Sequence, residues 1–253
     1  MGRKGKGGAS KNPAGEDGKG SGETTRDPKS TFREWVTSLL IALVLFLVIR
    51  TFLINTFVII SGSMEETLLV GDLLLVNRVS VGSRVPGTSI RIPGYSKPER
   101  GDVLVFDPHH EVDMKLVKRL IGLPGDTLEM RGKQLFLNGE RLSEPYVRHE
   151  SAGDALTDPI MMWQLDFLLP GIDRSAYQPT RDDWGPIIIP GGHYFMLGDS
   201  RDSSYDSRYW GPLEQGRIEG SVVLVYFSYN KASFRPFPWL REVRWGRILD
   251  LVR

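Results

Sequence analysis

The chain lacks cysteine and is poor in histidine; its 253 residues include four, His109, His110, His149 and His193. Without cysteine it can form neither a disulfide nor a thiolate metal site, and an oxidising exterior is compatible with the chain. The run 109–113, His-His-Glu-Val-Asp, has the residue types of a metal site, but it follows Pro108 in a polar segment and we interpret it as a solvated loop. The sequence therefore predicts no metal and no cofactor.

An excess of charge of either sign is also missing, since 32 Lys and Arg face 31 Asp and Glu. No overall field favours binding to a polyanion, so nucleic acid is not expected as a partner. Apolar side chains are nearly absent from residues 1–30, which are rich in Gly, Lys, Ser and Asp. Such a segment buries too little surface to offset the entropy of ordering it, and it predicts a disordered tail.

A long apolar segment follows the tail. Its central run, 36–49, is shorter than the roughly 20 residues that a membrane span needs. Phe32 and Trp35 extend it on one side and residues 52–54 on the other, because the side chain of Arg50 can reach the headgroups. Residues 31–54 are therefore predicted to form one transmembrane anchor.

Basic residues are frequent on the N-terminal side of this anchor, which places the tail in the cytoplasm and the larger C-terminal part outside. An alternative is a cleaved secretory signal, since Ser61-Gly62-Ser63 is itself a small-x-small pattern. The basic region would then exceed 30 residues and the cleavage site would lie far beyond the apolar run, so an uncleaved anchor is preferred.

The remainder of the chain has the pattern of β-strands. Short apolar or β-branched runs bounded by Gly, Pro or Asp occur at 73–76, 103–106, 116–120 and 222–227. Residues 127–142 predict strand, a turn at 131–133, strand, and a hairpin turn at Asn138-Gly139. Residues 143–190 carry several prolines and weak periodicity, which indicates a loop-rich insertion.

The C-terminal segment 234–252 mixes aromatic side chains with arginines. This composition suits a membrane interface. Packing of the same side chains on the β-domain explains it equally well, and the sequence leaves both interpretations open.

Two residue types in this chain could supply nucleophilic chemistry without histidine. A serine hydroxyl is a weak nucleophile until a base takes its proton, and Ser63 of the Ser-Gly-Ser run is a better candidate than Ser61. Lys118 can be the base if burial lowers its pKa, and its neighbours in 116–121 are mostly apolar. From local sequence alone, an ordinary exposed lysine is the simpler interpretation.

A third segment, 198–211, changes this balance. It alternates charges of both signs with four serines, which is typical of a rigid hydrogen-bonded loop. Five runs stand in order along the chain: Ser61-Gly62-Ser63-Met64-x-x-Thr67-Leu68, Gly71-Asp72, Arg100-Gly101-Asp102-Val103, Lys118-Arg119-x-x-Gly122-Leu123-Pro124-Gly125-Asp126 and Gly198-Asp199-x-Arg201-Asp202-x-Ser204-x-Asp206-Ser207-Arg208-Tyr209-Trp210-Gly211. Together these runs resemble, in the same order, the motif boxes of bacterial type I signal peptidases, also called leader peptidases.

The resemblance implies a role for individual residues. Ser63 resembles the nucleophile, Lys118 the general base, Ser61 a donor to the oxyanion, and Ser204 the serine that orients the lysine. Positions that line small substrate pockets in the family correspond to Phe57, Ile59, Met64, Leu116 and Val117. Charged positions that brace the site correspond to Arg119, Asp199, Arg201, Asp206 and Arg208.

Three positions depart from the family pattern. Glu66 stands where the family usually has proline, Ser200 where asparagine is frequent, and Ile60 where proline is common. Loss of a proline frees the backbone φ near Ser63. A carboxylate close to Lys118 would favour its charged form, and we expect Glu66 to point to solvent instead.

The expected fold is mainly β: a coiled antiparallel β-sheet catalytic domain, 55–126 and 191–253, with a smaller inserted β-hairpin and loop-rich subdomain, 127–190, after one transmembrane helix. The expected activity is a membrane-anchored Ser63/Lys118 endopeptidase that removes signal peptides after small-x-small motifs. It would sit in the bacterial cytoplasmic (inner) membrane as a single-pass protein, with its catalytic domain outside. Expected partners are the signal peptides of exported preproteins and the lipid bilayer, with the secretion translocon as a further candidate.

Two alternatives differ in class. One is a self-cleaving or regulatory Ser/Lys protease that shares the β-fold, such as the LexA-like repressors, and the predicted anchor argues against it. The other is a membrane-tethered protein that binds signal peptides without cleaving them, which the changes at Glu66 and Ser200 make conceivable.

Overall fold

The computed structural model describes residues 28–49, 54–84, 91–109, 114–151 and 156–252. The chain divides into two compact units, residues 1–44 and 45–253. Nearly all of the predicted tail, and residues 110–113 of the histidine-containing run, lie outside the described residues.

Helix α1, Pro28–Val48, occupies most of the segment in which an anchor is predicted. Its apolar side chains are at least 39% exposed on every face, from Phe32 to Leu47. No helix among the described residues is both long and apolar enough to cross a membrane. The helix is therefore confirmed, and the transmembrane span predicted for residues 31–54 is not found.

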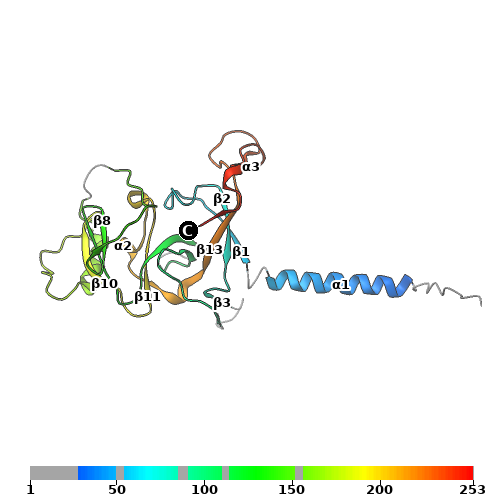
Figure 1. Cartoon of the computed structure of the whole chain (residues 1–253), viewed down its shortest axis with the longest axis horizontal. Helices are drawn as coiled ribbons and strands as arrows, with labels where there is room; N and C mark the ends of the chain where they lie inside the picture. Colours follow the sequence, from blue (N-terminus) through cyan, green and yellow to red (C-terminus); the bar gives the residue numbers. More distant parts are fainter. Residues whose placement is uncertain (1–27, 50–53, 85–90, 110–113, 152–155, 253) are drawn as a thin grey trace, which may run out of the picture. The chain divides into compact units, whose positions relative to one another are not determined.

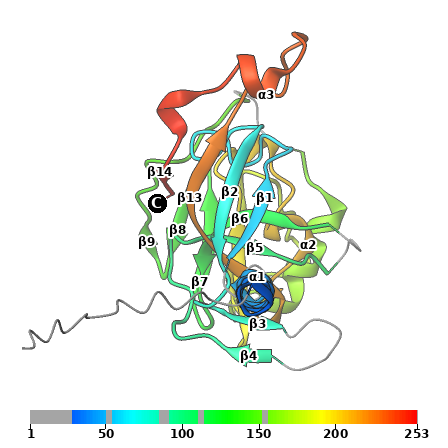
Figure 2. The same ribbon diagram turned by 90° about the vertical axis from the view of Figure 1, so that its right-hand side faces the viewer.

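The main sheet is antiparallel and has eight strands (Figures 1 and 2). Their order is β1 (Ile54–Val58), β2 (Asp72–Asn77), β13 (Ile218–Ser228), β5 (Val103–Phe106), β6 (Leu116–Gly122), β11 (His193–Leu197) and β12 (Leu213–Glu214), with β14 (Asp250–Leu251) paired to β13. All four runs predicted as strands from their apolar pattern are strands, and strand β13 is longer than predicted.

Strand β13 explains why this sheet is coiled. Its eleven residues pair with β5 at one end and with β2 at the other. Register shifts interrupt both pairings. Such irregularities bend a strand and increase its twist, which allows β13 to pair with β5 along one part of its length and with β2 along another. The predicted coiled antiparallel sheet is confirmed.

A second, four-stranded sheet lies wholly within residues 127–190. Its order is β10 (Trp184–Ile188), β7 (Thr127–Arg131), β8 (Gln134–Leu137) and β9 (Glu140–Arg141). Both predicted turns are present, with positive φ at Gly132 and Lys133 and again at Asn138 and Gly139.

The segment 143–190, predicted to be a loop-rich insertion, contains two regular elements that its sequence pattern did not indicate. Residues Pro159–Phe167 form the 3-10 helix η2, and Trp184–Ile188 form strand β10. The sequence does not predict β10, because it contains Gly185 and Pro186 and both residue types are unfavourable inside a strand. The strand is tolerated because it lies at the edge of its sheet and shifts register between Trp184 and Ile187. The remaining short elements are β3 (Gly82–Arg84), β4 (Arg91–Pro93), η3 (Arg201–Ser203), α2 (Ser207–Trp210), η4 (Gln215–Arg217), α3 (Pro238–Arg241) and η5 (Trp245–Arg247).

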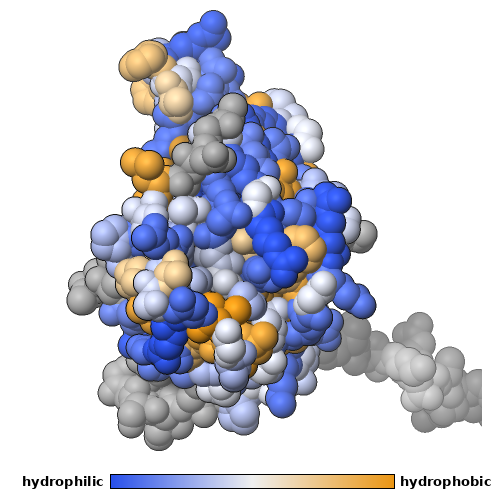
Figure 3. Space-filling view, turned by 90° about the vertical axis from the view of Figure 1, so that its left-hand side faces the viewer, coloured by the Kyte–Doolittle hydropathy of each residue, from blue (hydrophilic) through white to orange (hydrophobic). Residues whose placement is uncertain are grey.

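The two sheets share a hydrophobic core. One buried cluster contains Ile121 and Phe195 from the main sheet together with Leu128 and Ile187 from the second sheet. The side of the molecule that carries β8 and β10 is shown in Figure 3, where hydrophobic residues gather in a limited patch among hydrophilic ones. The boundaries predicted for the insertion stay a prediction, because residues 45–253 form one compact unit.

Arginines rather than aromatic rings hold the C-terminal segment to the main sheet. Arg247 donates to the carboxylate of buried Asp72 at 2.7 Å and to the Thr67 carbonyl at 2.8 Å. Arg244 donates to the Val70 carbonyl at 3.0 Å. In contrast, Trp239 is 54% and Trp245 is 75% exposed. Packing on the β-domain therefore does not account for these rings.

The close contact between β6 and β11 depends on Gly122, which lies opposite Phe195. A Cβ at Gly122 would lie 2.7 Å from Leu128 Cδ1 and 2.8 Å from Phe195 Cβ. We expect Gly122→Ala to lower the free energy of unfolding by about 1–3 kcal/mol through overpacking, measured by urea denaturation. Gly191→Ala is the control, because nothing lies within 4 Å of its added Cβ. Equal stability of the two variants would contradict this explanation.

Candidate active site

Ser63 lies in a tight turn that follows strand β1. The pairing of β1 with β2 continues one residue further, since Ile59 N–H donates to the Asp72 carbonyl at 2.9 Å. The chain then turns, with Leu68 N–H donating to the Met64 carbonyl at 2.8 Å. Met64 and Leu68 are buried in the core beneath the turn, which fixes Ser63 with only 8% of its surface exposed.

Lys118 reaches the same point from the middle of strand β6. Its backbone lies opposite Leu104 of β5, and the residue is 3% exposed. Its Nζ is hydrogen-bonded to Ser63 Oγ, across 55 residues of sequence. The structure thus brings together the two residues that the sequence predicts as nucleophile and base.

Burial is the main influence on the Lys118 amine. It lowers the pKa of Lys118 to about 8; the charge of Asp206 opposes the change and the charge of Arg208 adds to it. No carboxylate among the described residues lies within ion-pair distance of Nζ. A substantial neutral fraction of the amine is therefore present near pH 8, and a neutral amine can accept a proton from Ser63 Oγ.

Ser61 also lies close to Ser63, with the two Oγ atoms 3.5 Å apart. This distance places its hydroxyl at the reacting centre, in keeping with the predicted role as an oxyanion donor. The role itself stays a prediction.

Ser204 and Ser200 differ from the other site serines, because their buried Oγ atoms have no hydrogen-bond partner among the described residues. No bond joins Ser204 to Lys118, so its orienting role also stays a prediction. Ser204 nevertheless lies close to the nucleophile. A Cβ at Gly198 would lie 2.2 Å from Ser204 Oγ and 2.5 Å from the Ser63 carbonyl oxygen, so only glycine fits between them.

Buried ion pairs surround these serines. Arg119 and Asp199, each about 1% exposed, form a bidentate pair at 2.9 and 2.7 Å. Thr67 Oγ1 donates to Asp199 at 2.5 Å and accepts from Arg119 at 2.9 Å, which ties the turn after Ser63 to this pair. The ring of Tyr146 stacks 3.9 Å from Arg119 Cζ.

A second pair joins Asp206 to Arg208 through two hydrogen bonds of 2.8 Å. Burial would raise the pKa of Asp206, but the positive charge and hydrogen bonds of Arg208 lower it. Asp206 also accepts from Gly198 N–H at 3.1 Å, so it fixes the segment that packs on Ser63. The predicted bracing positions Arg119, Asp199, Asp206 and Arg208 therefore all take part in buried pairs.

The partner of the remaining bracing residue, Arg201, was missed in the sequence. Arg201 binds Glu144 in a bidentate pair at 3.0 and 2.6 Å, and the side chains are 1% and 5% exposed. Asp202, the nearer carboxylate in the motif, instead accepts from the backbone N–H groups of Glu150 and Ser151. The segment 198–211 contains three aspartates and two arginines, so its charges give no sign that Arg201 pairs with a residue outside it.

Glu66 does not approach the lysine. Its side chain is 54% exposed and lies 3.7 Å from Arg148 NH1, so the expectation that it points to solvent is confirmed. Its φ is +94°. Proline is restricted to φ near −65°, so this turn conformation depends on the absence of the proline that the family usually has here.

A cavity of about 270 Å³ opens beside Ser63 and Lys118. Its walls come from residues 58–61, 63–64 and 114–118, and they include four of the five predicted pocket residues: Ile59, Met64, Leu116 and Val117. The fifth, Phe57, does not line the cavity and packs against the cluster below it. The cavity is mainly apolar, and both Ser63 and Lys118 line it.

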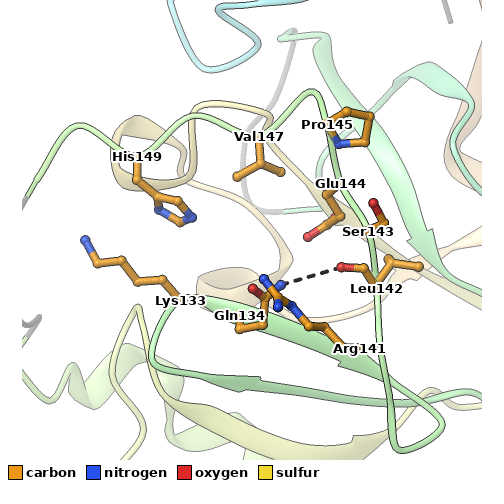
Figure 4. A pocket seen from close by; sticks show the side chains of 9 residues that line it. All are labelled: Lys133, Gln134, Arg141, Leu142, Ser143, Glu144, Pro145, Val147 and His149. Atoms are coloured by element: carbon orange, nitrogen blue, oxygen red, sulfur yellow. Dashed lines mark hydrogen bonds between the residues drawn. The ribbon is translucent and has the colours of Figure 1, made fainter.

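A larger cavity, of about 560 Å³, lies beside the hairpin of β7, β8 and β9 (Figure 4). Polar and charged side chains line it, among them Lys133, Arg141 and His149, and neither Ser63 nor Lys118 reaches it. Among the described residues no cluster of three or more histidine or acidic side chains could hold a metal ion.

Comparison with known proteins gives consistent results. Residues 32–227 match the family described as Signal peptidase, peptidase S26. "Signal peptidase I" of Pseudomonas aeruginosa is 40% identical over 81% of this chain and 76% of that protein. The protein of the same name from Bacillus licheniformis is 34% identical over 83% and 96% of the two chains. A solved signal peptidase I from Enterococcus faecalis is 32% identical and covers 50% of this chain and 97% of that one, with a TM-score of 0.34.

The lowered pKa of Lys118 has a consequence for stability. The unfolded chain holds the lysine proton up to pH 10.4 or so, and the folded chain only up to about 8. Burial of Lys118 therefore lowers the free energy of unfolding. The full effect is present below pH 8, and it disappears as the pH rises to roughly 10.4. At about 1.36 kcal/mol per pH unit, it amounts to about 3 kcal/mol.

We therefore expect Lys118→Met to be more stable than the unsubstituted chain at pH 7, by up to about 3 kcal/mol, with the difference closing near pH 10.4. Urea denaturation across this pH range measures it. Lys115→Met is the matched control, because Lys115 is bonded to Asp107 and Glu219 and its loss should not stabilise the chain. A Lys118→Met variant that is less stable at pH 7 would show that the amine is not penalised by burial.

Proposed function

Because the chain belongs to the signal peptidase family, peptidase S26, whose members are serine proteases, we propose that it cleaves signal peptides from exported preproteins with Ser63 as nucleophile and Lys118 as base. The observation that carries this proposal is the hydrogen bond between Ser63 Oγ and the amine of Lys118, a residue that is only 3% exposed. An exposed or acid-paired lysine would stay charged at neutral pH and could not accept the proton.

In the proposed reaction, Ser63 Oγ attacks the carbonyl carbon of the scissile bond while neutral Lys118 Nζ accepts its proton. The resulting ammonium then donates this proton to the leaving amine, and an acyl-enzyme ester on Ser63 remains. The same lysine then takes a proton from water as the water oxygen attacks the ester carbonyl; the ammonium returns the proton to Ser63 Oγ as the ester bond breaks, and the signal peptide is released with a free carboxylate. One buried amine thus acts in both halves of the reaction.

Two further features support the proposal. Ser61 Oγ and the Ser63 N–H can donate hydrogen bonds to the oxyanion, and the loss of one such donor typically slows a protease about 100- to 1,000-fold. The cavity of about 270 Å³ is small and mainly apolar. Such a cavity suits the short side chains of a small-x-small motif, because larger side chains would overlap its walls.

Membrane attachment is the second part of the proposal. The side chains of α1 expose an apolar surface on all sides, and the C-terminal segment exposes Phe237, Trp239 and Trp245 beside arginines. A helix that is apolar all round is not stabilised by water, and aromatic rings beside basic residues favour a bilayer interface. The enzyme is thereby held at the bacterial cytoplasmic membrane, with its tail inside and Ser63 at the outer face, where exported preproteins emerge.

The attachment predicts that the full chain sediments with phospholipid vesicles, and that Leu39→Asp with Leu43→Asp moves it to the supernatant. Each aspartate in an apolar membrane segment costs about 3 kcal/mol. Leu39→Ile with Leu43→Ile, the matched control, should sediment like the unsubstituted chain. Vesicle binding that survives both aspartates would exclude α1 as the anchor.

The Ser63–Lys118 pair predicts that Ser63→Ala and Lys118→Ala each abolish cleavage of a purified preprotein with an Ala-x-Ala site. Lys115→Ala serves as control for loss of a neighbouring lysine. In the unsubstituted enzyme kcat/KM should rise with pH and level off above about 8, because the base must be neutral. Turnover by either alanine variant, or a profile set by a group near 6.5, the usual pKa of histidine, would refute the pair.

A further inference from the structure

The segment 144–149 presents different side chains to its two sides. Val147 and His149 point into the larger cavity (Figure 4). The alternating residues face the active site: Tyr146 stacks on Arg119, and the Arg148 guanidinium lies beside Glu65 and Glu66 in the turn that follows the nucleophile.

The backbone holds Arg148 in this place. Its N–H donates to the Asp199 carbonyl at 2.9 Å, and its carbonyl accepts from Arg201 N–H at 3.0 Å. The residue between them, Ser200, donates its N–H to the Ser63 carbonyl at 3.2 Å. Arg148 is therefore fixed relative to the nucleophile by three backbone hydrogen bonds in series.

One guanidinium faces three carboxylates here. Arg148 lies 3.8 Å from Glu65, 3.7 Å from Glu66 and 3.6 Å from Glu150, and all four side chains are between 36% and 54% exposed. These distances are too long for hydrogen bonds. We call these four residues the exit cluster; it carries a net charge of −2 that water reaches and that Arg148 only partly offsets.

The exit cluster and the apolar cavity are separate parts of the surface near Ser63. Residues 58–61, before the nucleophile, line the cavity, whereas none of the four cluster residues does. The cluster is nevertheless close to the reacting atoms, since Glu65 Oε2 lies 3.3 Å from the position of a Cβ on Gly62, the residue between the two serines. In the proposed function the residues before the cleaved bond fill the cavity, which leaves the surface beside this carboxylate for the residues that follow the bond.

We infer that the exit cluster contacts the first residues after the cleaved bond and selects preproteins in which these residues are basic or uncharged over those in which they are acidic. This inference rests on the proposed function, in which the residues before the bond occupy the apolar cavity. Glu65 and Glu66 are then specificity-determining residues, and Arg148 sets the strength of the selection.

The expected size of the selection follows from the charges. An extended peptide advances about 3.3 Å per residue, so its first three residues after the bond lie within roughly 10 Å of Ser63. For a net charge of −2 at about 10 Å in water, exchanging lysine for glutamate changes the interaction by about sevenfold at 0.01 M ionic strength. Screening reduces this to about twofold at 0.15 M.

The test compares kcat/KM for three preproteins that differ only in carrying Lys, Gln or Glu at the second position after the cleavage site. At 0.01 M ionic strength we expect a Lys-to-Glu ratio of about seven, with Gln between them and a smaller ratio at 0.15 M. The double variant Glu65→Gln, Glu66→Gln should bring the ratio close to one. Arg148→Gln should raise it to about 20, because the net charge becomes −3.

Two control variants distinguish an effect of the charge of the exit cluster from a general effect of substitution on the enzyme. Glu140→Gln removes one negative charge from the exposed strand β9, outside the exit cluster, and should keep the ratio of the unsubstituted enzyme. Arg148→Lys preserves the charge and should keep it as well. An equal ratio in the unsubstituted enzyme and the double glutamine variant, with the Gln preprotein still cleaved, overturns the inference and leaves the proposed function intact. Failure to cleave any of the three preproteins overturns the proposed function instead.

Discussion

The burial of one amine is the constraint on which the rest of the structure depends. Lys118 lies on a central strand of the main sheet, 3% exposed, with its Nζ bonded to Ser63 Oγ. Removal from water lowers its pKa to about 8, at a cost of about 3 kcal/mol to the folded state. This cost is a large share of the free energy of unfolding of an ordinary domain, so other interactions in the fold have to offset it.

The buried ion pairs hold the residues around this amine in place. Arg119–Asp199, Arg208–Asp206 and Arg201–Glu144 are each bidentate and almost fully buried. Each pair joins segments distant in sequence, except for Asp206 and Arg208. Buried pairs of this kind add little net stability, but breaking one leaves an uncompensated charge. The pairs fix the positions of Ser63, Gly198 and Lys118. Because their carboxylates are bound to arginines, none of them forms an ion pair with Lys118 that would keep its amine charged.

Much of the site could be predicted from the sequence because its residues recur in short ordered runs. The β-strands with clear apolar pattern, the two hairpin turns, the serine and the lysine were all identified in this way. Strand β10 was not, because Gly185 and Pro186 conceal it and its pairing with β7 tolerates them only at a sheet edge. Glu144 and Tyr146 were missed for another reason: they lie in a poorly patterned segment and reach the site only through folding.

The sequence by itself determined the residue types of the candidate active site. They are a serine in a motif without histidine, a lysine among apolar residues, and a similar number of acidic and basic residues. Local patterns are enough for this, because strand, turn and residue type are properties of short segments. Only the tertiary structure decided which lysine loses its water, which arginine pairs with which carboxylate, and that Glu66 turns toward Arg148 rather than Lys118. Desolvation and pairing depend on neighbours that are far away along the chain, and no local pattern encodes them.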